Sequence, residues 1–333
     1  MTHTNSQTCD GTPPNPLLGW FDWVSEMSCF WGVTVAGRGG ECVSKGDAEF
    51  TQGQFEGMAY MLYRPAARPA ESLLLMLHGC GQRPVDFAKG TAMNEAALKA
   101  GFAVLYPAQS STANSQGCWN WHLPSHQERG QGEPAMLAAL TLHVAMQCQI
   151  DLKRVYAAGL SAGGAMAAIL GETYPEVFTA VGVHSGIPTR CATDLNSALA
   201  AMNGRGHTPS AISSQVPMIV FHGDGDTTVH SCNGERLAIG CAGEGAISKR
   251  TTVLEGGRHS TRTVHRTRDG KVIAEHWCIH GAAHRWSGGN AAGTYADHLG
   301  PNASAKMLKF FKHHSLDGRL SLMGSLKCEE EDS

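Results

Sequence analysis

Short apolar runs alternate with longer amphipathic segments along most of the chain. Mostly apolar runs lie at 73–77, 102–106, 178–183 and 216–221, and a turn with glycine or proline follows each of them. Such runs predict strands that are buried on both faces, which is typical of a parallel sheet. Within 154–170 another apolar strand, a glycine-flanked turn and an alanine-rich helix follow one another.

The segments between these runs predict helices and loops. Helices are expected at 85–100 and 133–150, and Glu133 and Pro134 suit the first turn of the second helix. A helix at 304–313 follows the last strands, and polar loops are expected at 109–132 and 190–214. Weaker patterns predict an edge strand at 55–64, a strand at 251–254 and a hairpin formed by 262–268 and 271–277 around Asp269-Gly270.

This alternation of strands and helices, without a repeat or an obvious linker, predicts one α/β domain with a mainly parallel sheet over 46–315. An irregular segment, 1–45, precedes the domain, and a tail, 316–333, follows it. In such sheets ligands bind beyond the carboxyl ends of the strands, so the loops there are the place to look for chemistry.

Composition excludes several classes of function. The 333 residues carry 26 basic and 29 acidic side chains, a net charge of −3, so no basic field indicates binding of nucleic acid or an anionic membrane. No apolar run approaches the length of a membrane span.

Cysteine usage bears on the compartment. The first ten residues lack the basic and apolar regions of a signal peptide, so either the protein stays inside the cell or a leader precedes this sequence and is removed. Eleven cysteines favour an oxidising compartment, extracellular or periplasmic, and no C-x-x-C pair indicates a zinc ribbon.

The turn at Gly159-Leu-Ser-Ala-Gly163 has the G-x-S-x-G pattern of a nucleophile elbow, with Ser161 at its apex. A serine hydroxyl attacks a carbonyl only when a base takes its proton and donors hold the oxyanion. With 40 glycines in the chain the pattern alone is weak, and a plain loop serine is the alternative. Its place between a predicted strand and a predicted helix favours the elbow.

An acid and a base are expected on later loops. Asp226 follows the strand 216–221, with Asp224 as its competitor, and an ordinary acidic turn is the alternative for both. His284 lies in a loop of small residues after the last core strands. The order Ser161, Asp226, His284 is that of α/β-hydrolases, in which the histidine takes the serine proton and the carboxylate fixes its tautomer.

Two backbone amides are expected to form the oxyanion hole. One belongs to Ala162, directly after the nucleophile, and the other to Cys80 in the His78-Gly-Cys-Gly-Gln82 loop after the strand 73–77. A simple strand-to-helix turn is the alternative for the second loop.

Nine motifs together resemble the poly(3-hydroxybutyrate) depolymerase family of esterases, relatives of feruloyl and acetylxylan esterases, over about residues 55–312. The motifs are 77–82 (LHGCGQ), 106–109 (YPAQ), 118–121 (CWNW), 129–133 (RGQGE), 154–164, 174–178 (YPEVF), 183–186 (VHSG), 222–229 and 281–289.

The resemblance implies an α/β-hydrolase fold, with a mainly parallel central sheet and helices on both faces, and hydrolysis of carboxylic esters. It assigns the roles of nucleophile, acid and base to Ser161, Asp226 and His284, and family members are often secreted. No separate polymer-binding module is expected after the catalytic region, and residues 1–45 carry none of the resembling motifs.

The expected function is that of a serine esterase that uses no metal or organic cofactor. Its expected substrate is a polyester, an oligomer or a small ester of the 3-hydroxybutyrate type, and the alternative is a feruloyl or acetyl ester of the plant cell wall. A non-catalytic binding protein on a hydrolase scaffold is the alternative from another class. The oligomeric state is left open by the sequence.

Three tryptophans and two cysteines complete the expected site. Trp119, Trp121 and Trp286 are candidate walls for the substrate, with core packing as the alternative. Cys80 and Cys118 lie in loops expected to flank the site, and a disulfide between them would fix the oxyanion loop to the tryptophan loop.

Overall fold

A computed structural model describes residues 48–66, 68–206 and 216–316. Of the three predicted parts of the chain, it therefore covers nearly all of 46–315, whereas 1–45 and all but the first residue of 316–333 lie outside the described residues.

Ten strands form one sheet in the order β1-β2-β4-β3-β5-β6-β7-β10-β9-β8. The six inner strands from β4 to β10 run parallel, and an antiparallel pair extends the sheet at each side. Their bounds are β1 Ala48–Phe55, β2 Met58–Pro65, β3 Ser72–Leu77, β4 Phe102–Pro107, β5 Val155–Leu160, β6 Ala180–His184, β7 Met218–Gly223, β8 Ile247–Glu255, β9 Arg258–Arg266 and β10 Val272–Ile279. A separate two-stranded sheet pairs β11 (Trp286–Ser287) with β12 (Ala296–Asp297).

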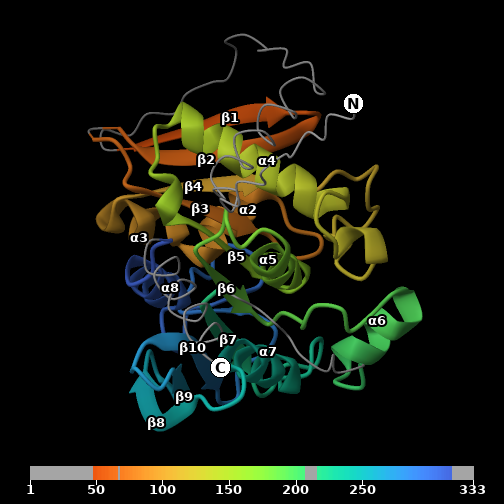
Figure 1. The fold of residues 1–333 in the computed structure, drawn as a ribbon, viewed down its shortest axis with the longest axis vertical. Helices are drawn as coiled ribbons and strands as arrows, with labels where there is room; N and C mark the ends of the chain where they lie inside the picture. Colours follow the sequence, from red (N-terminus) through yellow and green to blue (C-terminus); the bar gives the residue numbers. More distant parts are fainter. Residues whose placement is uncertain (1–47, 67, 207–215, 317–333) are drawn as a thin grey trace, which may run out of the picture. The chain divides into compact units, whose positions relative to one another are not determined.

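Helices cover both faces of the large sheet (Figure 1). One face carries α4 (Gly132–Gln147), α5 (Ala162–Thr173) and α7 (Cys232–Ala242), and the other carries α2 (Pro84–Thr91), α3 (Met93–Ala100) and α8 (Ala303–Lys312). Short helices η1 (Pro124–His126), η2 (Leu152–Arg154) and α6 (Leu195–Met202) lie in the connections. This arrangement confirms the predicted α/β-hydrolase fold with a mainly parallel sheet.

The predicted apolar runs form the central strands of the sheet. Every residue of β3, β4, β5 and β7 is buried. Tyr156 of β5 stacks on Phe311 of α8, with ring centroids 4.9 Å apart, on the α8 face of the sheet. A continuous apolar sequence is what a strand with helices on both faces requires.

Several boundaries differ from the prediction. The predicted helix 85–100 is two helices, because Ala92 has a left-handed backbone with φ 49° that ends α2. The predicted edge strand 55–64 is split by a turn at Glu56-Gly57, and the true edge is β1. The loop 190–214 contains α6, whose first turn is closed by a capping box between Asp194 and Ser197.

Strand register brings the carboxyl ends of β3, β5 and β6 together. Leu77 pairs with Gly159, and Leu160 pairs with His184, so the loops that begin at His78 and Ser161 leave the sheet side by side. At the neighbouring position Gly223 of β7 pairs with Ile279 of β10. The loops with the predicted acid and base therefore leave the sheet at the same edge.

Candidate active site

Ser161 lies on a strained turn between β5 and α5. Its backbone has φ 57° and ψ −120°, and its amide donates to the carbonyl of His184 at 2.9 Å. A positive φ in a residue with a side chain is uncommon, and residues strained in this way cluster at functional sites. Ser161 is also half-buried, unlike the fully buried residues on either side of it.

The two glycines of the turn allow the helix to approach the sheet. A Cβ at Gly163 would lie 2.1 Å from the carbonyl oxygen of Leu77, and one at Gly159 would lie 2.3 Å from the carbonyl of Gly163. Both distances are far below van der Waals contact with backbone atoms that cannot rotate away. The sequence pattern therefore has a steric cause: only glycine fits at these two positions.

The structure pairs the predicted acid with the predicted base. Nδ1 of His284 lies 2.6 Å from Oδ2 of Asp226, and the Asp226 side chain is completely buried. The other carboxylate oxygen accepts the backbone amides of Thr228 and Val229 at 2.9 and 2.8 Å. These bonds fix the carboxylate in the loop and aim one oxygen at His284.

The hydrogen bonds around Asp226 also keep it ionised. Burial alone would raise the pKa of this carboxyl, but bonds with His222 and His284, together with the backbone amide of Val229, lower it well below its usual range. A buried carboxylate that stays charged can hold one tautomer of His284 and stabilise the imidazolium form.

Asp224, the competing acid, has another partner. Its Oδ2 lies 2.7 Å from Nδ1 of His280, and its Oδ1 accepts the amide of Gly281 at 2.6 Å. About two fifths of each of the side chains of Asp224 and His280 is exposed, in contrast with the buried Asp226. The structure therefore pairs His284 with Asp226 and not with Asp224.

His184 connects the histidine loop to the elbow. Its carbonyl accepts the Ser161 amide, and its Nε2 accepts the amide of Ser287, three residues after His284, at 3.0 Å. Burial, followed by the charges of His222 and His284, lowers the pKa of His184 to about 3, so the ring is neutral. The sequence offered only one signal of this role, a polar residue at the end of a buried strand.

Three amides of the loop after β3 already have acceptors. The amide of Gly79 donates to Gln82 Oε1 at 2.9 Å, that of Gly81 to the carbonyl of Gln116 at 2.9 Å, and that of Gln82 to the carbonyl of Gly79 at 3.2 Å. Within the described part of the chain, the amide of Cys80 donates to no acceptor. Ala162 begins α5, where the first amides of a helix have no partner within the helix.

Two contacts attach the tryptophan loop to this turn. The predicted disulfide between Cys80 and Cys118 is present in the structure, and the indole of Trp119 donates to the carbonyl of His78 at 3.1 Å. Glu133, predicted only as a residue of the first turn of its helix, accepts with its buried carboxylate the backbone amide and the side chain of Asn120, both at 2.7 Å. An acidic residue in the first turn of a predicted helix was the available signal in the sequence.

The three tryptophans expected as substrate walls are all largely buried, two of them almost completely. Trp119 and Trp286 are 0% and 1% exposed, and the Trp286 indole donates to Ser304 while its ring stacks on His184. Core packing, the alternative given above, describes both. Trp121 is 8% exposed, so its expected contact with substrate stays a prediction.

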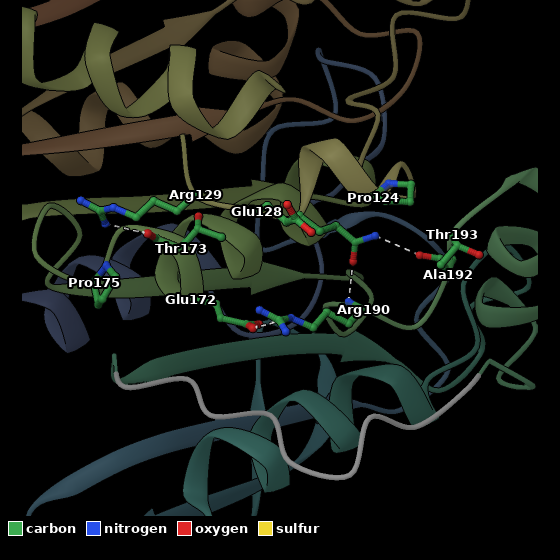
Figure 2. A pocket seen from close by; sticks show the side chains of 10 residues that line it. Pro124, Glu128, Arg129, Glu172, Thr173, Pro175, Arg190, Ala192 and Thr193 are labelled. Atoms are coloured by element: carbon green, nitrogen blue, oxygen red, sulfur yellow. Dashed lines mark hydrogen bonds and ion pairs between the residues drawn. The ribbon is translucent and has the colours of Figure 1, made fainter. Parts of the chain in front are cut away.

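A cavity of about 580 Å³ lies away from these residues, lined mainly by charged and polar side chains (Figure 2). Glu172 and Arg190 point toward each other there, 2.8 Å apart. Glu172 and Thr173 belong to the carboxyl end of α5, and Ser161 stands before its first residue. Eleven helical residues separate Ser161 from Thr173, a rise of about 18 Å, so this cavity does not contain the proposed nucleophile.

The chain matches a known protein family over more than half of its length. The family described as esterase PHB depolymerase matches residues 58–243, more than half of the 333 residues. The chain belongs to this esterase family. Ser161 and Asp226 lie within the matched region, and His284 lies beyond it, so its pairing with Asp226 rests on the structure.

Two relatives illustrate the range of the family. Poly(3-hydroxyalkanoate) depolymerase C of Paucimonas lemoignei is 31% identical over 235 residues, which cover 66% of this chain and 56% of the relative. Feruloyl esterase B of Neurospora crassa is 29% identical over 190 residues, which cover 51% of this chain and 63% of the relative. The chain therefore spans about half to two thirds of the length of the curated relatives it matches.

Among solved structures, an acetyl xylan esterase from Aspergillus awamori aligns with a TM-score of 0.57 at 16% identity. The alignment covers 77% of this chain and 94% of that chain, which supports the common fold. Across the described residues of this family member, no helix is both long enough and apolar enough to cross a bilayer.

Proposed function

We propose that the protein is a serine carboxylic-ester hydrolase that works through an acyl-enzyme. The observation that carries the proposal is the 2.6 Å contact between buried Asp226 and His284, on loops that leave the sheet beside the elbow. Family membership supports ester hydrolysis as the reaction class.

In this mechanism Nε2 of His284 takes the proton of Ser161 as Oγ attacks the ester carbonyl. Asp226 holds Nδ1 of His284 and stabilises the imidazolium that forms. The amides of Cys80 and Ala162 donate to the oxyanion, because neither is used within its own loop or helix. The imidazolium then protonates the leaving alcohol, and His284 activates the water that releases the acid.

The proposed substrate is a polyester or oligomer of the 3-hydroxybutyrate type. The matching family and the relative from Paucimonas lemoignei, which is named for depolymerisation of poly(3-hydroxyalkanoate), support this choice. The second candidate is a feruloyl or acetyl ester of plant cell walls, favoured by the relative named feruloyl esterase B. A disulfide at Cys80–Cys118 supports a place in an oxidising compartment, outside the cytoplasm.

Hydrolysis of p-nitrophenyl butyrate by the wild type and by Ser161→Ala tests the reaction. We expect the variant to lose at least about 10⁴-fold in kcat, the loss typical of a missing nucleophile. Equal rates would leave a non-catalytic binding protein on a hydrolase scaffold as the better description. A parallel panel of hydroxybutyrate oligomers, methyl ferulate and acetylated xylan then ranks the substrate classes by kcat/KM.

A further inference from the structure

Three side chains of different chemistry meet beside the catalytic loops. They are the carboxylate of Asp224, the thiol of Cys278 and the imidazole of His280, and their ligand atoms all lie within 4.8 Å of one another. We propose that these residues form a binding site for a borderline-soft divalent cation such as Zn²⁺, a function separate from ester hydrolysis.

Topology brings the three donors together from two neighbouring strands. Cys278 and His280 are two residues apart at the end of β10, so they point to the same side of the strand. β7 runs parallel to β10, with Gly223 opposite Ile279, and the amide of Asp224 donates to the carbonyl of Ile279 at 3.1 Å. The strand register therefore places Asp224 level with His280.

Surrounding contacts orient two of the donors. Nε2 of His280 lies 2.9 Å from Oγ1 of Thr261, and the amide of Gly281 donates to Oδ1 of Asp224. Nδ1 of His280 and Oδ2 of Asp224 are the atoms that face each other, 2.7 Å apart. An imidazole held through its other nitrogen is the usual arrangement of a metal-binding histidine.

Binding of a zinc ion by these three side chains requires only small side-chain movements. Zinc bonds of about 2.0–2.3 Å in a tetrahedral site put two ligand atoms about 3.3–3.8 Å apart. An ion would replace the direct contact between His280 and Asp224 and draw in the sulfur of Cys278. The exposed side chains of Asp224 and His280 give the ion a path from solvent and leave a fourth position for water.

The donor set selects the class of cation. A thiolate and an imidazole favour Zn²⁺, Co²⁺ or Cd²⁺, whereas Mg²⁺ and Ca²⁺ prefer oxygen ligands alone. Binding releases the Cys278 thiol proton to the buffer, because the thiolate is the ligand form. The ion would cross-link the two loops and so stabilise the folded chain.

Titration with Co²⁺ tests the site directly, because a thiolate bound to cobalt gives a charge-transfer band in the near ultraviolet. We expect the band in the wild type, its loss in Cys278→Ser, and at least about 10-fold weaker binding in His280→Gln, in which the thiol is intact. Cys148→Ser is the matched control, since Cys148 is also a free, half-buried cysteine, and it should retain the band.

Zn²⁺ should raise the Tm of the wild type and of Cys148→Ser, and equal Mg²⁺ should not. Far-UV circular dichroism checks that each variant is folded, and His280→Gln, altered at an exposed side chain, carries the test if Cys278→Ser is unfolded. A wild type without the band at millimolar Co²⁺, a band that persists in folded Cys278→Ser, or unchanged affinity in His280→Gln would overturn the proposal.

Discussion

The carboxylate of Asp226 lies 2.6 Å from Nδ1 of His284 and is completely buried, whereas Asp224, two residues earlier, contacts His280 at 2.7 Å in an exposed setting. Two acid–histidine pairs therefore stand side by side on the same two loops. Because Asp226 is buried and Asp224 is exposed, we expect a substitution of Asp226 to reduce kcat far more than one of Asp224.

We expect Asp226→Asn to lower kcat for p-nitrophenyl butyrate by about 10³–10⁴-fold, because the amide would favour the wrong tautomer of His284. Asp224→Asn, the matched control, should cost at most about 10-fold, because it only loosens the loop through Gly281 and His280. Initial rates at saturating substrate measure both. Equal losses in the two variants would refute the assignment of Asp226 as the acid.

The glycines of the elbow should be intolerant of any side chain. Gly163→Ala places a Cβ 2.1 Å from the carbonyl oxygen of Leu77, so we expect it to lower the free energy of unfolding by at least about 3 kcal/mol. Gly57→Ala is the control, because φ there is +80° but the space is open, and its cost should be about 1 kcal/mol. Urea denaturation compares them, and similar costs would argue against steric exclusion.

The disulfide should matter for both stability and rate. Cys80 and Cys118 are 38 residues apart, and removing a cross-link of that length costs about 2–4 kcal/mol of unfolding free energy. The Cys80→Ser/Cys118→Ser double variant should also lose kcat, because the Cys80 amide would no longer be held in place. Cys148→Ser is the control. A double variant with wild-type kcat would show that the disulfide is not needed to position the Cys80 amide.

Acid should destabilise the protein through its buried histidines. Burial is the largest cause that lowers the pKa of His184 to about 3 and that of His276 to about 4, whereas an unfolded histidine titrates near pH 6.5. Between those values the unfolded state binds more protons, so stability falls as pH drops from about 6.5 toward 3.

His184→Gln should reduce this pH dependence by up to about 1.4 kcal/mol per pH unit. Urea midpoints at pH 7.5, 6.0 and 5.0 measure the slope, provided that unfolding is two-state. An unchanged slope would show that His184 can bind a proton in the folded state.

The sequence pattern predicted the central sheet because burial on both faces leaves a plain signal. β3, β4 and β7 are mostly apolar, and their predicted bounds agree with the structure to within two residues. β8 shows the opposite case: seven of its nine residues are exposed, so it carries no apolar pattern beyond the four residues predicted at 251–254. Its place is set by pairing with β9, which a local pattern does not contain.

Chain order carries the prediction of Ser161, Asp226 and His284 as site residues, and the structure pairs the last two. The choice between Asp224 and Asp226 was harder, because both follow the same strand and only the loop path separates their partners. The role of a tryptophan is equally hard to predict, because a large apolar ring suits a core and the wall of a binding site equally. The sequence does not record that Trp286 lies under His184.

β10 lies between β7 and the outer β9–β8 pair, and the loop that follows it carries His284. On the ribosome, Ser161 and its elbow are therefore synthesised 123 residues before the histidine, taking residue 284 less residue 161. The pairing of β10 with β7 is what brings the loop of His284 to the edge of the sheet at which the elbow lies. More than a third of the chain thus separates the proposed nucleophile from its proposed base, and only the completed central sheet carries both at one edge.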